Sequence, residues 1–258
     1  MTATITRSVL DPRRLARIAG VLYLVIIASG LFSELVVRGT LVVRGDAAAT
    51  AANILAADTL FRVGVVSDLV MVLADVAIAV ALYVLFAPVS RTLSATAAAF
   101  RLAQAAVLAL NLLHQFAALL VLRQDGALSA FDPDQLEALA LLLMDLHRYG
   151  YLLGLVLFAG NLAVTGYLLY RSGFLPRTLG ALSVLAAAGY LIDTLMFVLL
   201  PGYDGAASNL VLAPAFVFEL GFASWLLIKG VDAVAWRRAA ATTRDADHRA
   251  VAPVGATA

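Results

Sequence analysis

Long apolar stretches alternate with short polar segments along the chain, and six of these stretches are long enough to cross a bilayer. A spanning α-helix needs about 20 predominantly apolar residues, because it rises about 1.5 Å per residue across a hydrocarbon core about 30 Å thick. The stretches lie near Leu15–Val37, Thr59–Phe86, Ser94–Leu122, Leu146–Tyr170, Thr178–Leu200 and Leu210–Lys229. This pattern predicts an all-α, polytopic membrane protein, a bundle of six transmembrane helices.

Composition supports the same class. Hydrophobic residues make up 63% of the 258 residues and charged residues 14%, against about 45–50% and about 25% in soluble domains. The chain has no cysteine, which excludes disulfides, thiolate metal sites and cysteine nucleophiles. Because the chain is so apolar, the lipid bilayer is the first partner that the sequence predicts.

Lysine and arginine are distributed unevenly between the loops. With the N-terminus inside, the outer loops hold only Arg38, Arg44 and Arg123. The inner side collects Arg7, Arg13, Arg14, Arg17, Arg91, Arg171, Arg177, Lys229, Arg237, Arg238, Arg244 and Arg249. Since cytoplasmic loops carry such an excess, we expect both termini in the cytoplasm and the protein in the cell inner (plasma) membrane.

This topology divides the chain into three parts. We expect residues 1–13 to form an N-terminal cytoplasmic tail and residues 14–230 to form the six-helix transmembrane domain. Residues 231–258 are expected to be a cytoplasmic C-terminal segment that is mostly disordered, because the tail after residue 238 is rich in small and polar residues.

Three aspartates are placed to cap helices in the outer loops. Asp46 is expected to cap a short helix over residues 47–57, and Asp58 to cap the second span. Asp132 precedes a proline at the first helical position, so a helix begins there. A helix from there to Tyr170 would be about 57 Å long, so it must protrude, tilt or break, and Gly150 is the candidate break.

The second span carries two carboxylates, Asp68 and Asp75, seven residues apart and thus on one helix face. A charge at membrane depth is costly and persists when it points into a bundle and finds a partner. The third span offers partners within an arc of about 80°. These are Arg101, Gln104, Asn111 and Gln115.

We predict that Asp75 and Arg101 form an ion pair between the second and third spans. The alternative is that Arg101 extends to the headgroups and Asp75 takes up a proton. Glu219, near the middle of the sixth span, is either protonated or shares Arg101, or it forms a structural hydrogen bond between helices.

Charged and titratable residues also gather at the outer end of the spans. They are Glu34, Arg62, Asp68, His114, Asp145, His147, Arg148 and Asp193. One interpretation is a solvated rim without function. The other is an outward-facing polar vestibule whose two histidines titrate near neutral pH.

The fourth span has a face suited to the bundle interior. Helical spacing places His147, Tyr151, Gly154, Phe158, Asn161 and Thr165 on it. Two glycines four residues apart, Gly150 and Gly154, favour close helix packing.

Several classes of chemistry lack their motifs. The histidines His114, His147 and His248 have no metal-ligand spacing, so we expect no metal and no cofactor. No nucleophile elbow and no phosphate-binding loop is present, and the basic residues give no support for nucleic-acid binding. A membrane hydrolase or transferase could use His147 with Asp145 or Asp193, but no nucleophile is placed, so the sequence favours a non-enzymatic protein.

Four segments together resemble a bacterial family of integral membrane proteins. They read GDAAATAANILA, FRVGVVSDLVMVLADVAIAVALYVLF, SRTLSATAAAFRLAQAAVLALNLL and RSGFLPRTLGALSVLAAAGYLID. The family is domain of unknown function 4386, and the resemblance covers about Arg14 to Lys229. It implies a six-helix membrane protein and supplies no activity, substrate or catalytic residue.

The residues themselves favour small-solute or proton-linked transport or binding. Asp68, Asp75 and Arg101 would form the polar centre, lined by Asn111, His147, Asp193 and Glu219. The alternative is a non-catalytic membrane scaffold or regulator that acts through partner helices, in a homo-oligomer or with another membrane protein. A water-filled cavity that reaches Asp75 would favour transport, and a dry core with Asp75 fully paired would favour the scaffold.

Overall fold

The computed structural model describes residues 11–124, 126–203 and 205–251, and all of its long elements are helices. The elements are α1 (Pro12–Leu31), the π-helical segment η1 (Phe32–Arg38), α2 (Gly39–Leu41), α3 (Ala47–Ala56), α4 (Asp58–Phe86), α5 (Arg91–Arg123), η2 (Gly126–Ala130), α6 (Pro133–Ser172), α7 (Arg177–Leu199), α8 (Gly205–Ile228) and α9 (Ala233–Val251). Six helices are long and apolar enough to span a membrane, the first being α1 continued through η1 and α2. The predicted all-α architecture with six long apolar helices is confirmed.

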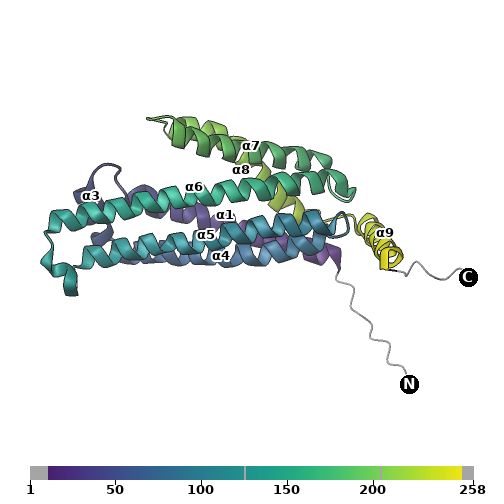
Figure 1. The fold of residues 1–258 in the computed structure, drawn as a ribbon, viewed down its shortest axis with the longest axis horizontal. Helices are drawn as coiled ribbons and strands as arrows, with labels where there is room; N and C mark the ends of the chain where they lie inside the picture. The colour runs from purple at the N-terminus through teal and green to yellow at the C-terminus, as the bar shows by residue number, and fades with distance from the viewer. Residues whose placement is uncertain (1–10, 125, 204, 252–258) are drawn as a thin grey trace, which may run out of the picture.

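The six spanning helices form a closed ring in chain order. Each packs on the next from α4 to α8, and α1 closes the ring by packing on both α4 and α8. In Figure 1 α1, α4, α5 and α6 run side by side along the long axis, whereas the α7–α8 hairpin is inclined to them. The described chain begins and ends at one end of this bundle, with α9 there and α3 at the opposite end.

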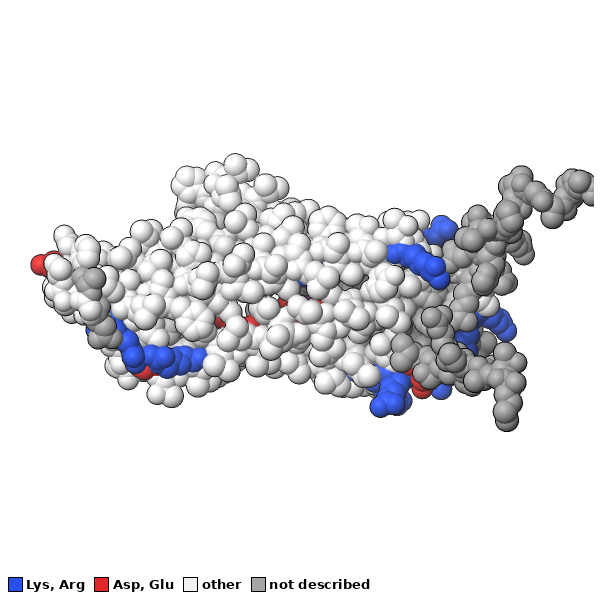
Figure 2. All heavy atoms as spheres, turned by 60° about the horizontal axis from the view of Figure 1, so that its bottom comes forward, with Lys and Arg blue, Asp and Glu red and all other residues white. Residues whose placement is uncertain are grey.

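The outer surface of the ring is apolar, as a lipid-facing surface must be. Leu73, Leu110 and Leu153 point outward from three different helices and are 64–70% exposed. Figure 2 shows one face of the molecule whose middle is largely free of charge, with lysine and arginine toward its two ends. The interior packs around aromatic rings such as Tyr23, which meets Phe222 edge-on at 5.6 Å.

The inclination of the α7–α8 hairpin follows from glycines at one end of the bundle. A Cβ on Gly180 would lie 2.7 Å from the Gly166 carbonyl oxygen, so the backbones of α6 and α7 touch there. From this contact the two helices diverge toward the end that carries α3 (Figure 1). Helices α6 and α7 are therefore in contact at the glycine pair and separated at the end that carries α3.

Two of the three predicted caps are confirmed and one is wrong. Asp46 accepts a hydrogen bond from the Ala49 amide at 2.9 Å, and Asp132 accepts one from the Asp134 amide at 3.0 Å. Asp58 lies inside the first turn of α4 and caps nothing. Its carboxylate instead accepts from the Arg62 guanidinium one turn later, at 2.9 Å, in an exposed i,i+4 pair.

The predicted break at Gly150 is absent, because α6 runs through it unbroken from Pro133 to Ser172, 40 residues in all. A helix of this length is about 60 Å long and exceeds the hydrocarbon thickness, so it protrudes. Its first turns are stabilised by packing on α3, where Leu136 and Ile54 share one buried cluster. Gly150 serves instead as a point of close approach to α5, since a Cβ there would lie 2.0 Å from Asn111 Oδ1.

Part of the C-terminal segment that was expected to be mostly disordered, residues 233–251, forms the helix α9, while residues 252–258 lie outside the described part. Asp232 caps this helix through the Val234 and Ala235 amides at 2.9 and 3.1 Å. Trp236 is buried and its indole Nε1 donates to the Leu85 carbonyl oxygen at 2.8 Å. The Asp232 cap and the buried Trp236 thus stabilise a helix in a segment whose polar composition favours disorder.

Candidate functional site: two buried charge clusters and a pocket

The predicted pair of Asp75 and Arg101 is confirmed near the middle of the bundle. Arg101 Nε and Nη2 lie 2.9 and 2.6 Å from the same oxygen, Asp75 Oδ1, and both residues are 1% exposed. Arg101 Nη1 also donates to the Tyr23 hydroxyl at 3.2 Å. The guanidinium lies 4.9 Å from the Tyr23 ring centroid and 5.0 Å from that of Phe158, so it does not extend to the headgroups.

Little space is left beside this central pair. A cavity lined by Arg101, Asn161 and Ser94 has a volume of only about 10 Å³, room for about one water molecule. The pair is thus surrounded by protein, with α1, α4, α5 and α6 each contributing a side chain. Its geometry matches the dry, paired core that the sequence analysis associated with a scaffold.

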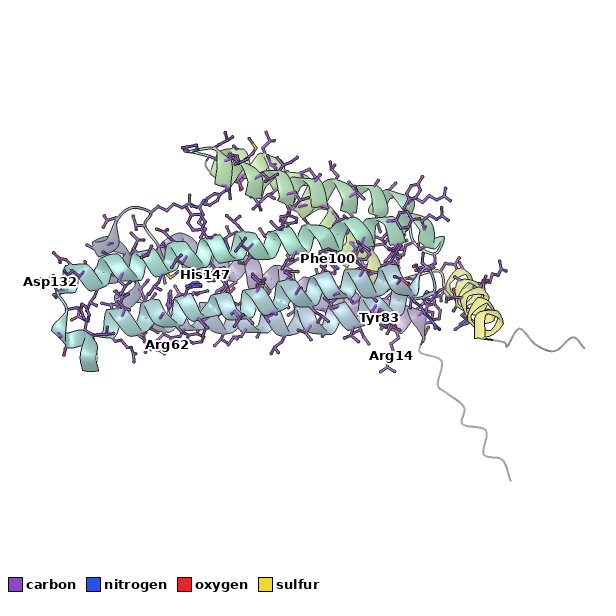
Figure 3. All side chains as sticks on the ribbon, in the orientation of Figure 1. Arg14, Arg62, Tyr83, Phe100, Asp132 and His147 are labelled. Carbon is purple, nitrogen blue, oxygen red and sulfur yellow. The ribbon has the colours of Figure 1, made fainter. Side chains whose placement is uncertain are left out.

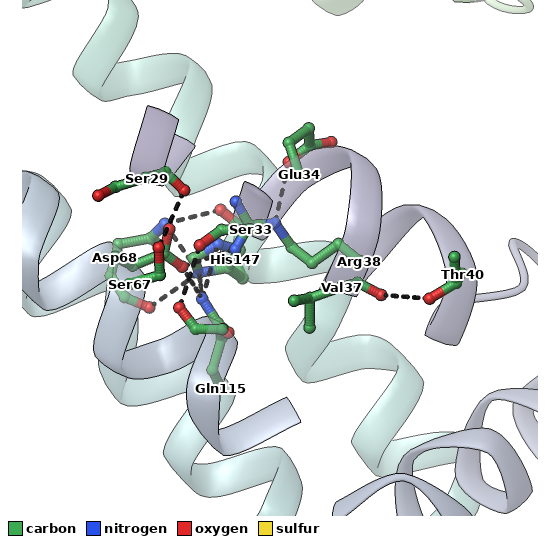
Figure 4. Close-up of polar contacts among 12 residues, drawn as sticks. Ser29, Ser33, Glu34, Val37, Arg38, Thr40, Ser67, Asp68, Gln115 and His147 are labelled. Atoms are coloured by element: carbon green, nitrogen blue, oxygen red, sulfur yellow. Dashed lines mark hydrogen bonds and ion pairs between the residues drawn. The ribbon is translucent and has the colours of Figure 1, made fainter. Parts of the chain in front are cut away.

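A second cluster lies one level further toward α3, around Asp68 (Figure 4). Arg38 Nη1 lies 2.6 Å from Asp68 Oδ2, and Gln115 Nε2 donates to the same oxygen at 2.9 Å. Arg38 Nε also pairs with Glu34 at 2.9 Å. Asp68 Oδ1 is buried and accepts no hydrogen bond from the described residues.

Arg38 was not predicted as part of a site. In the sequence it is an outer-loop charge, because the apolar run of the first span ends at Val37. Its signal was the i,i+4 spacing to Glu34, which places both side chains on one helix face. Arg38 is the last residue of the π-helical segment η1, and its side chain reaches Asp68 on the next span.

His147 links this cluster to α5 (Figure 3). Its Nε2 lies 3.1 Å from Gln115 Nε2, and its Nδ1 lies 3.2 Å from the Asn111 carbonyl oxygen. Asn111 Nδ2 donates to the His147 carbonyl oxygen at 2.8 Å. These contacts are all satisfied when a neutral imidazole donates from Nδ1 and accepts at Nε2 from Gln115, which is how we assign the tautomer.

Beside His147 lies a pocket of about 490 Å³ at the α3 end of the bundle, between η1, α6, α7 and α8. Its charged wall consists of Glu34, Arg38, Arg44, Asp145, Arg148 and Asp193. Asp193 is 4% exposed and accepts a hydrogen bond from the Tyr203 hydroxyl at 2.8 Å. The Arg148 guanidinium stacks over the Phe197 ring at 4.3 Å. The pocket lies where α7 and α8 incline away from α6.

The charged and titratable residues predicted at the outer end of the spans are only partly brought together. Glu34, Asp145, His147, Arg148 and Asp193 line the pocket, as the vestibule interpretation expects. Arg62 pairs with Asp58 on the outside, and His114 Nδ1 contacts the Asn111 carbonyl oxygen at 3.1 Å.

Glu219 belongs to neither cluster. The Tyr190 hydroxyl donates to Glu219 Oε1 at 2.5 Å, a hydrogen bond between α7 and α8. Within the described residues no basic side chain comes within ion-pair distance of it, so Glu219 does not form a direct ion pair with Arg101. The interhelical hydrogen bond is therefore present, and protonation of Glu219 stays a prediction.

Metal ligation finds no geometric support in the described ranges, where no three histidine, aspartate or glutamate side chains converge. What converges instead is hydrogen-bonding and charged groups of both signs around a pocket. Such an arrangement can bind and orient a polar molecule.

Comparison with known proteins places the chain in a family. The family described as "Domain of unknown function (DUF4386)" matches residues 18–230, which contain both charge clusters and the pocket. An uncharacterized protein of Archaeoglobus fulgidus is 33% identical over 169 residues, which cover 64% of this chain and 83% of that protein. No solved structure matches the chain. The protein belongs to the DUF4386 family.

Proposed function

We propose that this protein binds a small polar solute in the pocket beside His147. The observation that carries the proposal is the pocket itself, about 490 Å³ in volume and lined by charged groups of both signs. Pockets of about 300–1,000 Å³ with a few convergent polar groups are typical of small-molecule sites. Apolar residues such as Leu152 and Leu212 complete the lining, so the site suits a solute with both polar and apolar parts.

The enclosed central pair favours binding at one end over passage along the bundle axis. A solute that moved past Asp75 would have to separate it from Arg101, leaving two unpaired charges in a low-dielectric interior. A proton is a second ligand that suits the site, because His147 lines the pocket and contacts Gln115, which donates to Asp68. Protonation of His147 Nε2 would oppose the Gln115 amide and thereby act on Asp68.

A membrane scaffold is the second candidate, supported by the same central pair. Arg101 donates hydrogen bonds to Asp75 and to Tyr23, and these contacts tie together three helices without requiring any ligand. A scaffold would use its exposed apolar faces to contact partner helices or a second copy of the chain. It would need no occupant in the pocket.

We further propose that both termini lie in the cytoplasm of the plasma membrane and that the pocket opens on the opposite side. The support is the excess of basic residues at the end of the bundle where α1 begins. Those in the described range are Arg13, Arg14, Arg17, Arg91, Arg171, Arg177, Lys229, Arg237 and Arg238.

The absence of cysteine permits a direct test of pocket and orientation. Asn209→Cys places a thiol in the pocket lining, Leu195→Cys on the apolar surface, and Arg171→Cys at the opposite end. A membrane-impermeant thiol reagent applied to intact cells should label only the first. Labelling of Arg171→Cys instead would reverse the orientation.

The same labelling reports occupancy. Pools of small anions, small cations and small zwitterions are added to purified Asn209→Cys protein, and the rate of labelling is followed. A pool that contains a ligand should slow labelling of Asn209→Cys. If no pool changes the rate or the melting temperature, solute binding is refuted and the scaffold is favoured.

A further inference from the structure

Four of the six charged side chains that line the pocket have no oppositely charged partner among the described residues. Of its six charged residues, only Arg38 and Glu34 pair with each other. Across residues 11–124, 126–203 and 205–251, Arg44 and Arg148 have no acidic partner within ion-pair distance. In the same ranges neither Asp145 nor Asp193 has a basic one. The pocket therefore presents two unpaired cations and two unpaired anions.

Two of these four groups are held in place by the surrounding structure. Asp193 is 4% exposed and oriented by the Tyr203 hydroxyl, whereas Arg148 is held against the Phe197 ring. A buried carboxylate without a cation costs free energy unless a ligand supplies the opposite charge. Asp193 thus marks a position for a cationic group, and Arg148, together with Arg44, marks one for an anionic group.

The balance of charge discriminates between ligand classes. A simple anion would face Asp145 and Asp193 as well as the arginines, and a simple cation would face Arg44 and Arg148 as well as the aspartates. A molecule that carries both charges gains from both sets. Leu35, Leu155 and Leu212 leave an apolar part of the lining for a hydrocarbon substituent.

We infer that the ligand is a zwitterion with a primary ammonium, an acidic group and an apolar substituent. The ammonium pairs with Asp193, and the acidic group accepts from Arg148 and Arg44, as guanidinium groups favour carboxylate and phosphate oxygens. This inference rests on the proposed solute-binding function and names its ligand class. The same chemistry is found in a free α-amino acid and in an ethanolamine phospholipid headgroup.

The first experimental arm uses L-leucine and two analogues that each lack one charge. Isocaproate retains the carboxylate without the ammonium, and isoamylamine retains the ammonium without the carboxylate. Protein in the uncharged detergent dodecyl maltoside is titrated with each, and its melting temperature and the labelling rate of Asn209→Cys are measured. L-leucine should raise the melting temperature and slow the labelling of Asn209→Cys. Neither analogue should have these effects at the same concentration.

The second arm tests the lipid source. Phosphatidylethanolamine added to the same micelles is compared with phosphatidic acid, which keeps the phosphate and lacks the ammonium. An effect of phosphatidylethanolamine alone, with none from L-leucine, supports the inference with a lipid headgroup as the ligand. An effect of L-leucine supports a free zwitterion.

Variants connect binding to the two walls of the pocket. Asp193→Asn and Arg148→Gln should each weaken binding of the active zwitterion by about tenfold or more, the loss expected for one charge-assisted hydrogen bond. Arg148→Lys should recover part of the affinity if the charge is what matters. Arg62→Gln, outside the pocket, is the matched control and should bind normally.

Failure of the inference is distinguishable from failure of solute binding. Equal effects of L-leucine and of one singly charged analogue would overturn the zwitterion and leave a solute site. No effect of L-leucine or phosphatidylethanolamine also overturns it, and the labelling pools then decide whether any solute binds. Unchanged affinity in Asp193→Asn and Arg148→Gln, with both variants folded, would place the ligand elsewhere.

Discussion

Arg101 on α5 and Asp75 on α4 form an ion pair in which both guanidinium contacts converge on one carboxylate oxygen, at 2.9 and 2.6 Å. The pair is enclosed by the rings of Tyr23 and Phe158, which face the guanidinium from α1 and α6. Four of the six spanning helices therefore meet at one charged group. The cost of burying it is offset only while every partner stays in place.

Breaking this pair should be strongly destabilising. Asp75→Asn leaves Arg101 as an uncompensated buried charge, and we expect a loss of about 3–5 kcal/mol of unfolding free energy. Arg101→Gln in that background should add little, because the interaction is already gone. The measurement is thermal or denaturant unfolding in detergent, as a double-mutant cycle. Strictly additive losses would contradict the pairing, and Arg62→Gln serves as the surface control with little effect on the melting temperature.

Two glutamines of α5 should respond in opposite ways to the same replacement. Gln115 donates to the Asp68 carboxylate and contacts His147, so Gln115→Met should cost about 1.5–3 kcal/mol. Gln104 has a buried Oε1 with no hydrogen-bond partner in the described part of the chain, so Gln104→Met should be neutral or stabilising. Parallel denaturation of the two variants checks this, and equal losses would refute the difference in hydrogen bonding.

A methyl group added at Gly150 should disturb the His147 cluster. The Cβ of Gly150→Ala would lie 2.0 Å from Asn111 Oδ1, so Asn111 must move away from the His147 carbonyl oxygen. We expect a loss of about 1–3 kcal/mol. Gly221→Ala is the matched control, because no other group lies within 4 Å of the position that its Cβ would take. That variant should be stabilised by about 0.5–1 kcal/mol, and a similar loss in both would argue against close packing at Gly150.

Docking of α9 should depend on pH through Asp232, which lies outside the spanning segments. Hydrogen bonds from the Ala235 and Val234 amides lower the pKa of the Asp232 carboxyl below its ordinary value. The folded pKa is lower than the unfolded pKa, so the stabilisation is present above the ordinary aspartate value of about 3.9 and is lost as pH falls through the folded pKa. Acidification in that range should release α9.

Trp236 fluorescence in a Trp225→Phe background reports this release, because the Trp236 indole leaves a buried site. Asp232→Asn keeps a capping oxygen without the charge and should lose the acid-dependent step. Identical acid transitions in both proteins would show that another group controls the docking.

The sequence by itself determined the membrane class, the six spans and the central ion pair. A helix of about 20 apolar residues has few alternatives to crossing a bilayer, because its backbone groups are satisfied internally. The same cost that makes a charge rare at membrane depth made Asp75 and Arg101 identifiable as partners. Local caps at Asp46 and Asp132 were equally readable, since they depend on neighbouring residues only.

Only the tertiary structure decided what surrounds these elements. The ring closes between α1 and α8, Arg38 at the end of η1 reaches Asp68, and the touching backbones at Gly166 and Gly180 incline α7 away from α6. The pocket exists because of that inclination, and it unites Arg148 with Asp193 from different helices. Helix α6 continues through Gly150, and Trp236 docks α9 against the bundle. Both features arise because packing between segments distant in the chain outweighs local helix propensity.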